Sequence, residues 1–196
     1  MTIQTLPWYL ARAAGLMAWA LLTASVLWGL IISTKGSVLP RRPRPAWTLD
    51  LHRYLGGLAT VFTAVHVVAI LIDSYVHFDL LSVLVPFASS WRPGAVAWGI
   101  AAMYLLLAVE LTSLARRRLP KRAWRAIHFA SFPLFLVATV HGITAGTDGR
   151  TWLFEGVAAT AVLAVSALTA VRIDQATSRP GPTLPVPVPQ RERVAA

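Results

Sequence analysis

The chain has 196 residues, of which 56% are hydrophobic and 13% are charged, and it contains no cysteine. Soluble domains carry about 25% charged residues, so this composition, with a mean hydropathy of +0.61, indicates a membrane protein. The lack of cysteine excludes disulfide bonds, iron–sulfur clusters and covalently attached haem. The formal net charge of +10 comes from basic residues that are distributed as in the loops of a membrane protein, so we expect no nucleic-acid partner.

Five segments are long and apolar enough to cross a lipid bilayer of about 30 Å as helices. They are residues 13–32, 51–72, 95–114, 123–145 and 152–171. We therefore predict an all-α fold, an integral membrane bundle of about five transmembrane helices that forms one domain over residues 1–172. Residues 173–196 are rich in proline, and we expect them to form a disordered tail.

The basic residues gather after the first, third and fifth spans. Fifteen of them lie in these segments, and only Arg12, Arg92 and Arg150 lie on the opposite side. Because positively charged loops stay in the cytoplasm, we expect the N-terminus outside and the C-terminus in the cytoplasm. The composition, rich in arginine and alanine, suggests a multi-pass protein of a bacterial cytoplasmic membrane.

Four of the five histidines fall within two spans: His52 and His66 in the second, and His128 and His141 in the fourth. These spans cross the membrane in the same direction, because one helix separates them. His52 and His128 should therefore lie near the cytoplasmic face, and His66 and His141 near the outer face. On an ideal helix, His66 lies about 40° from His52 and roughly 21 Å further along the axis. The sequence predicts two facing pairs at two depths.

The second of these helices does not fit the pattern if it is straight. The thirteen residues from His128 to His141 would leave the two rings about 140° apart. Pro133 lies between them and removes a helical hydrogen bond. We therefore expect a kink near Pro133 that turns both rings toward a common partner.

Paired imidazoles inside a bilayer favour b-type haem, because neutral imidazole binds the iron while the apolar porphyrin packs between helices. We predict two bis-histidine haems, with His52 and His128 on the inner one and His66 and His141 on the outer one. Two alternatives remain open: histidines that only hydrogen-bond neighbouring helices, and a haem-free scaffold or transporter. A two-metal site is disfavoured, because roughly 20 Å of helix separates the levels.

Other residues near the histidines suit a haem site. Gly56, Gly57 and Gly142 lie close to the histidines in the sequence and would let a ring approach the backbone. Arg53 and Arg125 lie at the cytoplasmic ends of the spans, where they are candidates to pair with haem propionates. Both features also have ordinary explanations, in helix packing and in membrane topology.

The outer loop, residues 73–94, contains Asp73, His77 and Asp79. This cluster is either an ordinary solvated loop or a site that binds a metal ion or a cationic acceptor. The apolar run LLSVLVPF in the same loop is too short to span the bilayer. It either lies in the membrane interface or folds over the mouth of the bundle, and both interpretations remain open.

Two stretches, LHRYLGGLATVFTAVH and WRAIHFASFPLFLVATVHG, resemble the ferric reductase-like transmembrane family. This haem domain is shared by ferric reductases, NADPH oxidases and the bacterial MsrQ proteins, and the resemblance covers roughly residues 51–171. It implies that His52 and His128 hold the inner haem and that His66 and His141 hold the outer haem. It also implies transfer of single electrons from the cytoplasm to an outer acceptor, such as ferric ion, oxygen or a partner protein.

The chain also departs from the family. Relatives that use NADPH directly carry a flavin and nicotinamide domain after the last helix, whereas about 25 residues follow Val171 here. No glycine-rich dinucleotide fingerprint is present, so we expect no FAD or NADPH site and a separate flavoprotein or quinol as electron donor. A quinol-oxidising cytochrome b subunit of a respiratory complex is the alternative. Six spans are common in the family, and five are predicted here.

Overall fold

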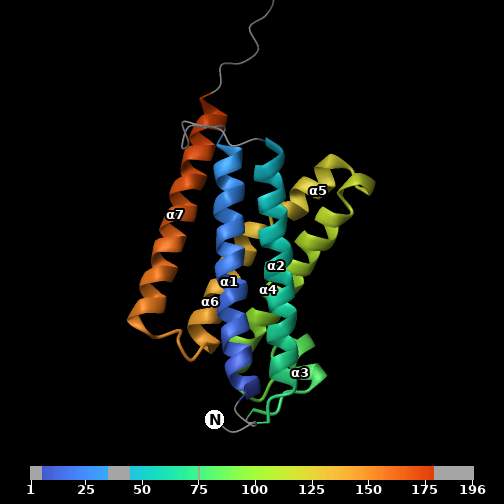
Figure 1. Ribbon diagram of the computed structural model, residues 1–196, viewed down its shortest axis with the longest axis vertical. Helices are drawn as coiled ribbons and strands as arrows, with labels where there is room; N and C mark the ends of the chain where they lie inside the picture. The colour runs from blue at the N-terminus through green and yellow to red at the C-terminus, as the bar shows by residue number, and fades with distance from the viewer. Residues whose placement is uncertain (1–5, 35–44, 75, 179–196) are drawn as a thin grey trace, which may run out of the picture.

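The computed structural model describes residues 6–34, 45–74 and 76–178, and these residues form helices without strands (Figure 1). The membrane-spanning helices are α1 (Leu6–Ser33), α2 (Pro45–Leu71), α4 (Pro93–Leu114), the pair α5 (Lys121–His128) and α6 (Ser131–Ala145), and α7 (Trp152–Thr177). The short helix α3 (Leu80–Leu84) and a 3-10 turn at Arg116–Arg118 complete the set. The predicted all-α bundle with five spans is confirmed.

Helix α7 runs further than the sequence predicted. Residues 173–177 were assigned to the disordered tail, but they continue the helix to Thr177. From the start of α7 at Trp152, the first proline in the sequence is Pro180, so nothing interrupts the backbone hydrogen bonds at residue 172. The Ser178 N–H closes the last turn on the Asp174 carbonyl at 2.9 Å. The rest of the predicted tail, residues 179–196, lies outside the described residues.

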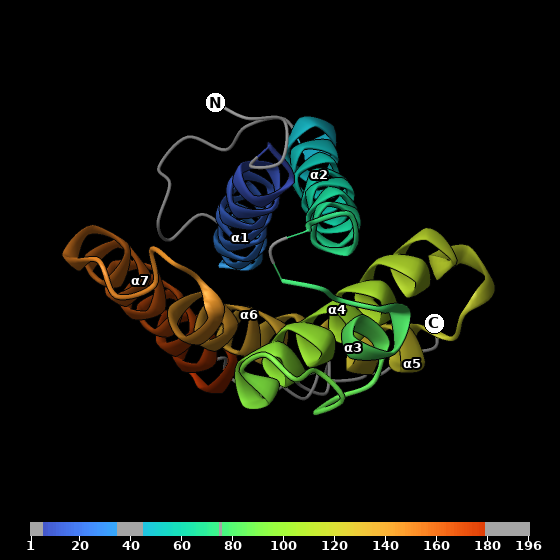
Figure 2. The same cartoon turned by 90° about the horizontal axis from the view of Figure 1, so that it is seen from below.

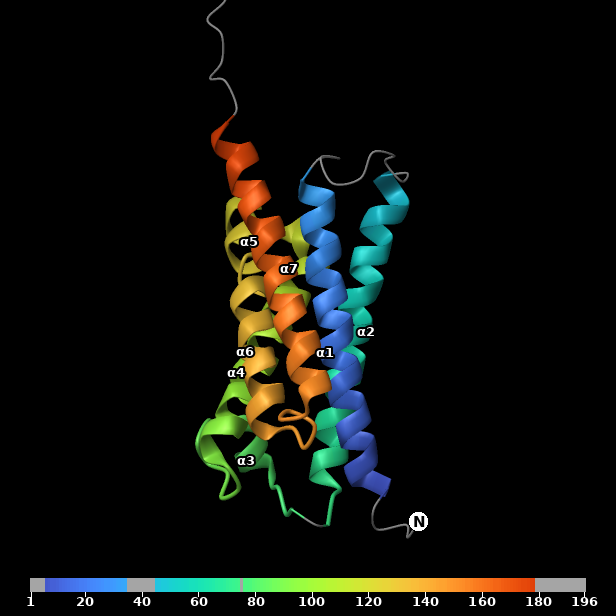
Figure 3. The ribbon, with the colours of Figure 1, turned by 90° about the vertical axis from the view of Figure 1, so that its left-hand side faces the viewer.

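Helix α1 lies at the centre of the bundle and packs against α2, α6 and α7, while α4 packs mainly against α6. Seen along the long axis, α1 and α2 form one group that faces a row made by α4, α6 and α7 (Figure 2). The long helices run roughly along the same axis (Figure 3). The start of α1, α3 and the α6–α7 connection lie at one end, and α5 and the end of α7 lie at the other.

A layer of buried apolar side chains lies about half way along the bundle. This apolar layer consists of Leu22, Val26, Leu30, Ala59, Ala102, Leu106, Leu134, Phe135, Ala161 and Val165. Phe135 is fully buried, with 0% of its surface exposed. Ala59 is seven residues from His52 and seven from His66, so the layer separates the two levels of histidines. Close packing of this kind holds membrane helices together, because lipid is as apolar as the side chains.

The fourth span is broken where the sequence predicted a kink. Helix α5 ends at His128 and α6 begins at Ser131, with Pro133 in its first turn. Proline has no N–H and clashes with the carbonyl four residues earlier, which belongs to Phe129. That carbonyl instead accepts a bond from the Phe132 N–H at 3.2 Å. The break gives His128 and His141 separate helical axes.

The predicted orientation can be tested with single cysteines, because the chain has none of its own. Ser74→Cys lies on the end that carries α3, and Ala176→Cys lies near the end of α7; both positions are exposed. We expect a membrane-impermeant maleimide to label Ser74→Cys in intact cells and Ala176→Cys only after lysis. The reverse pattern would contradict an outer N-terminus.

Candidate functional site

The structure brings the four membrane histidines together as two pairs. The ring centroids of His52 and His128 lie 5.9 Å apart, and those of His66 and His141 lie 6.2 Å apart. The two rings of each pair are nearly perpendicular, at 79° and 78°. All four residues are half-buried. The partners are those that the sequence predicted, and each pair joins α2 to the α5–α6 span.

We call His66 and His141 the outer pair, and His52 and His128 the inner pair, after the sides of the membrane that the basic loops predict. Both histidines of the outer pair donate a hydrogen bond to a backbone carbonyl on a neighbouring helix. His66 Nδ1 lies 2.7 Å from the carbonyl oxygen of Ala11 on α1, and His141 Nδ1 lies 2.8 Å from that of Ala95 on α4. A carbonyl can only accept, so Nδ1 carries the proton and Nε2 keeps its lone pair. This arrangement is typical of histidines that bind metals, because the bond at one nitrogen fixes the ring for the other.

Glycine makes these bonds possible. A Cβ added at Gly15 would lie 2.9 Å from His66 Nδ1, and one added at Gly99 would lie 2.6 Å from His141 Cε1. Each glycine comes four residues, about one turn, after the carbonyl that accepts the bond. Only a residue without a side chain lets the imidazole lie against the helix and reach that carbonyl.

His52, in the inner pair, repeats the same contact. Its Nδ1 lies 3.0 Å from the Ser25 carbonyl oxygen, and a Cβ at Gly29 would lie 3.1 Å from its Cε1. Gly29 follows Gly15 by fourteen residues, the same step that separates His66 from His52. Because α1 and α2 are antiparallel neighbours, one helix presents two equivalent contacts to the two histidines of the other.

His128 differs from the other three histidines. Its Nδ1 is buried and has no hydrogen-bond partner within the described part of the chain. The ring stacks on Trp124 at 5.0 Å with an interplanar angle of 21°. The Arg116 guanidinium lies 5.2 Å from the Trp124 ring, and that of Arg172 lies 5.3 Å from the ring of Phe129. Two arginines that the sequence analysis linked only to topology therefore border the inner pair.

The glycines that the sequence analysis singled out make other contacts. A Cβ at Gly142 would meet Phe154 at 3.1 Å, one at Gly56 would meet Glu110 Oε2 at 3.4 Å, and one at Gly57 would meet no atom within 4 Å. The imidazoles lie instead on Gly15, Gly29 and Gly99. The equal fourteen-residue steps of the glycines in α1 and the histidines in α2 could have revealed part of this contact.

The two predicted propionate partners lie at the surface. Arg53 is exposed and forms an ion pair with Asp50 at 3.7 Å. Arg125 is also exposed, three residues before His128 on α5.

A cavity of about 300 Å³ lies beside the outer pair. Both outer histidines and the two glycines that contact them line it, and most of its other walls are apolar. Its volume lies at the lower end of the range of about 300–1,000 Å³ that ligand sites occupy. The cavity does not extend to His52 or His128. This cavity therefore belongs to the outer site alone.

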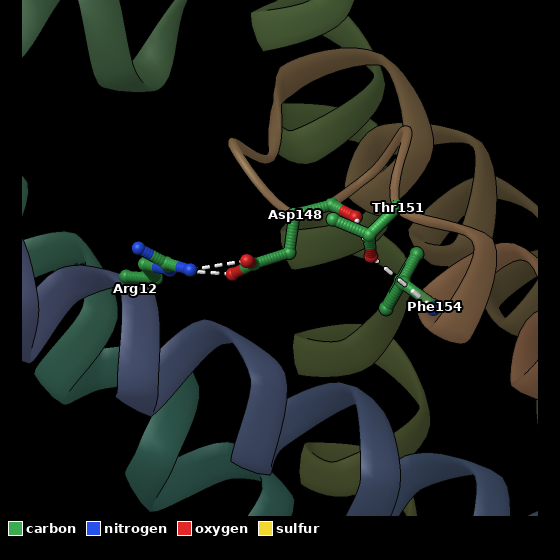
Figure 4. A network of polar contacts seen from close by, with 4 residues as sticks. All are labelled: Arg12, Asp148, Thr151 and Phe154. Atoms are coloured by element: carbon green, nitrogen blue, oxygen red, sulfur yellow. Dashed lines mark hydrogen bonds and ion pairs between the residues drawn. The ribbon is translucent and has the colours of Figure 1, made fainter.

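An ion pair fixes the edge of this cavity. Arg12 on α1 donates two hydrogen bonds to the carboxylate of Asp148, in the loop between α6 and α7 (Figure 4). The Thr151 hydroxyl donates to the Asp148 carbonyl at 2.7 Å and accepts from the Phe154 N–H at 3.3 Å, which caps α7. These bonds hold the outer end of α1 against the loop, so the two walls of the cavity keep their relative positions.

Both acidic residues of the outer loop accept hydrogen bonds from within the loop. Asp79 caps α3 by accepting bonds from the N–H and hydroxyl of Ser82, which hold the pKa of this carboxyl below its usual range. Asp73 accepts a bond from the Val76 N–H at 3.3 Å, and His77 is exposed. Over the described residues, no three acids or histidines gather as a metal site.

The apolar part of this loop borders the outer cavity. Helix α3 packs against α4, where the Tyr104 hydroxyl donates to the carbonyl of Leu84. Val76, Phe78 and Val83 line the cavity together with the outer histidines. Within the run LLSVLVPF, Val83 faces the cavity, and most of the other apolar side chains are exposed.

The model of one protein family, described as ferric reductase like transmembrane component, matches residues 14–139. The comparisons with curated proteins and with solved structures found no match. The family match covers more than half of the chain and contains His52, His66 and His128, and transmembrane domains of this family generally bind haem. The chain therefore belongs to the ferric reductase-like transmembrane family, as a multi-pass membrane protein and an electron-transfer component of the oxidoreductase type.

Proposed function

We propose that the chain is a b-type dihaem cytochrome that moves electrons across the membrane. The spacing of the histidine rings carries this proposal. Two imidazoles that bind one metal ion through nitrogens about 2 Å from it place their ring centroids about 6 Å apart. The two pairs have separations of 5.9 Å and 6.2 Å. His52 and His128 would hold the inner haem, and His66 and His141 the outer haem.

The hydrogen bonds of the histidines support the same assignment. In His52, His66 and His141, the Nδ1–H donates to a carbonyl, which leaves Nε2 neutral, unprotonated and free to bind iron. The pairs lie among apolar helices, and a neutral ligand avoids placing an extra charge in lipid. Bound haem would supply one-electron chemistry through ferric and ferrous iron.

The helices set the distance that electrons cross. His52 and His66 are fourteen residues apart on α2, which corresponds to roughly 21 Å along the axis. The apolar layer around Phe135 lies between the two levels. The chain would thus hold two redox sites at fixed depths, with apolar side chains between them.

The ends of the bundle suit different partners. The α5 end carries exposed basic residues, among them Arg117, Lys121 and Arg125. Such a surface would dock an acidic flavoprotein, and quinol in the membrane is the other possible donor. Arg53 and Arg125, with Arg116 and Arg172, are our candidates to pair with the inner haem propionates. The α3 end would face the outside of a bacterial cytoplasmic membrane. The electron acceptor, a ferric ion, oxygen or a protein, would bind there.

The first test is the haem content of the detergent-purified chain. We expect a reduced-minus-oxidised spectrum of low-spin haem b, and a pyridine haemochrome assay that gives two haems per chain. The chain is purified from cells grown with and without a haem precursor, and the haem content of the two preparations is compared to control for incomplete loading. A chain that stays free of haem under both conditions would contradict the proposal and favour a haem-free scaffold or transporter.

A second test separates the two sites. His66→Ala removes one ligand of the outer haem, so we expect that haem to be lost and transfer to an external acceptor to stop. The inner haem should still be reduced by a donor on the α5 side. His77→Ala, which alters an exposed histidine of the outer loop, should keep both haems and full transfer. Unchanged external reduction by His66→Ala would rule out the assignment of the outer site.

A third test addresses the glycine contacts. Gly99→Ala would place a Cβ 2.6 Å from the ring of His141, which would push the imidazole away from its carbonyl. We expect retention of the outer haem to fall by about tenfold or more, as when a metal-binding histidine loses the hydrogen bond at its other ring nitrogen. Gly156→Ala on α7 meets no atom within 4 Å and is the matched control. Equal haem loss in both variants would contradict a specific role for Gly99.

A further inference from the structure

One of the four paired histidines lacks the hydrogen bond that the others share. His52, His66 and His141 each donate from Nδ1 to a carbonyl, but the buried Nδ1 of His128 has no partner among the described residues. If His128 binds iron through Nε2, its proton resides on Nδ1 and needs an acceptor. A buried donor without an acceptor destabilises the site.

Helix α4 offers an acceptor at the corresponding position. On α1, the glycine contacts of the outer and inner histidines are fourteen residues apart, at Gly15 and Gly29. On α4, the glycine contact of the outer histidine is Gly99, and the residue fourteen positions further along is Ser113. The Ser113 hydroxyl oxygen is buried and also has no partner among the described residues. Helix α4 packs against α5, which ends at His128 (Figure 1).

The serine also explains why His128 makes no bond to a carbonyl. At Gly99, a Cβ would lie 2.6 Å from the imidazole, so a residue with a side chain at the equivalent position keeps a ring further away. The carbonyl four residues before Ser113 belongs to Val109, and it accepts a bond from the Thr112 hydroxyl at 3.2 Å. Ser113 thus places a side chain where the other sites have none, and this side chain carries a hydroxyl.

The other buried polar atoms without partners do not fit this role. Trp124 Nε1 can only donate, so it cannot accept the proton of His128 Nδ1. Its ring also stacks on His128 at an angle of 21°, so its N–H lies almost parallel to the plane of the imidazole. Asp73 Oδ1 follows α2 and lines the outer cavity, at the opposite end of the bundle. Within the described residues, Ser113 Oγ is the unpartnered acceptor on the side of His128.

We infer that Ser113 is a positioning residue for the inner site, which accepts the Nδ1–H of His128 through one bridging water, since the structure shows no direct bond between the two atoms. This inference rests on the proposed function, because it concerns His128 as an iron ligand. The bond orients the imidazole and makes it more basic, which stabilises ferric iron at the inner site. The outer site, which relies on two carbonyls, does not depend on this hydroxyl.

Three substitutions at one position test the inference. Ser113→Ala removes the acceptor but keeps the Cβ, so we expect a higher midpoint potential of the inner haem and about tenfold weaker retention of it. Ser113→Thr keeps the hydroxyl and should behave like the wild type. Ser113→Gly opens the way to the Val109 carbonyl, which the Thr112 hydroxyl can release because it keeps its shorter bond of 2.6 Å to the Ala108 carbonyl. This variant should therefore retain the wild-type properties although it lacks a hydroxyl.

The readouts are a redox titration and the electron paramagnetic resonance signals of the two ferric haems. The outer haem is the internal control and should not change in any variant. Thr112→Ala removes a hydroxyl one position away and should leave both haems unchanged. An unshifted inner haem in Ser113→Ala would overturn the inference, as would equal shifts in all three variants. A wild-type chain that binds no haem would overturn the proposed function as well.

Discussion

The site depends on one interaction, the hydrogen bond from a histidine Nδ1–H to a carbonyl of a neighbouring helix. A histidine in lipid must satisfy one nitrogen and leave the other free if it is to bind a metal. Helix carbonyls are already engaged within the helix, but each has a second lone pair that can accept from a ring lying against the backbone. Gly15, Gly29 and Gly99 provide that close approach, so the positions of three glycines determine where the ligands lie.

The same requirement fixes the packing of the helices. Two glycines on α1 and two histidines on α2 share a fourteen-residue step, so only one register of this antiparallel pair satisfies both histidines. A shift by one turn would place side chains of α1 against the imidazoles at both levels. Half way between the levels, Ala59 of α2 belongs to the packed apolar layer. The register that forms the two sites therefore also forms the core between them.

Much of this arrangement could be predicted from the sequence, and the reasons for the exceptions are physical. The five spans follow from hydropathy, the histidine pairing follows from helical geometry, and the break before Pro133 follows from the missing N–H. The glycine contacts were missed because they join different helices, and a single helix does not reveal which face its neighbour meets. The stacking of His128 on Trp124 and the ion pair of Arg12 with Asp148 likewise depend on tertiary positions. Helix α7 was cut short because hydropathy reports where lipid ends, not where a helix ends.

The break in the fourth span also accounts for the difference between the two levels. The outer ligand, His141, lies within α6, whose side chains Leu134 and Phe135 are anchored in the apolar layer. His128 instead ends an eight-residue helix that the break separates from that core. A short helix positions its side chains less strictly than a long packed one. A hydrogen bond from His128 to a fixed backbone carbonyl would require a more exact ring position than this helix provides. A rotatable hydroxyl tolerates more variation in ring position, which fits the presence of serine where α4 would otherwise carry a fourth glycine contact of the same kind.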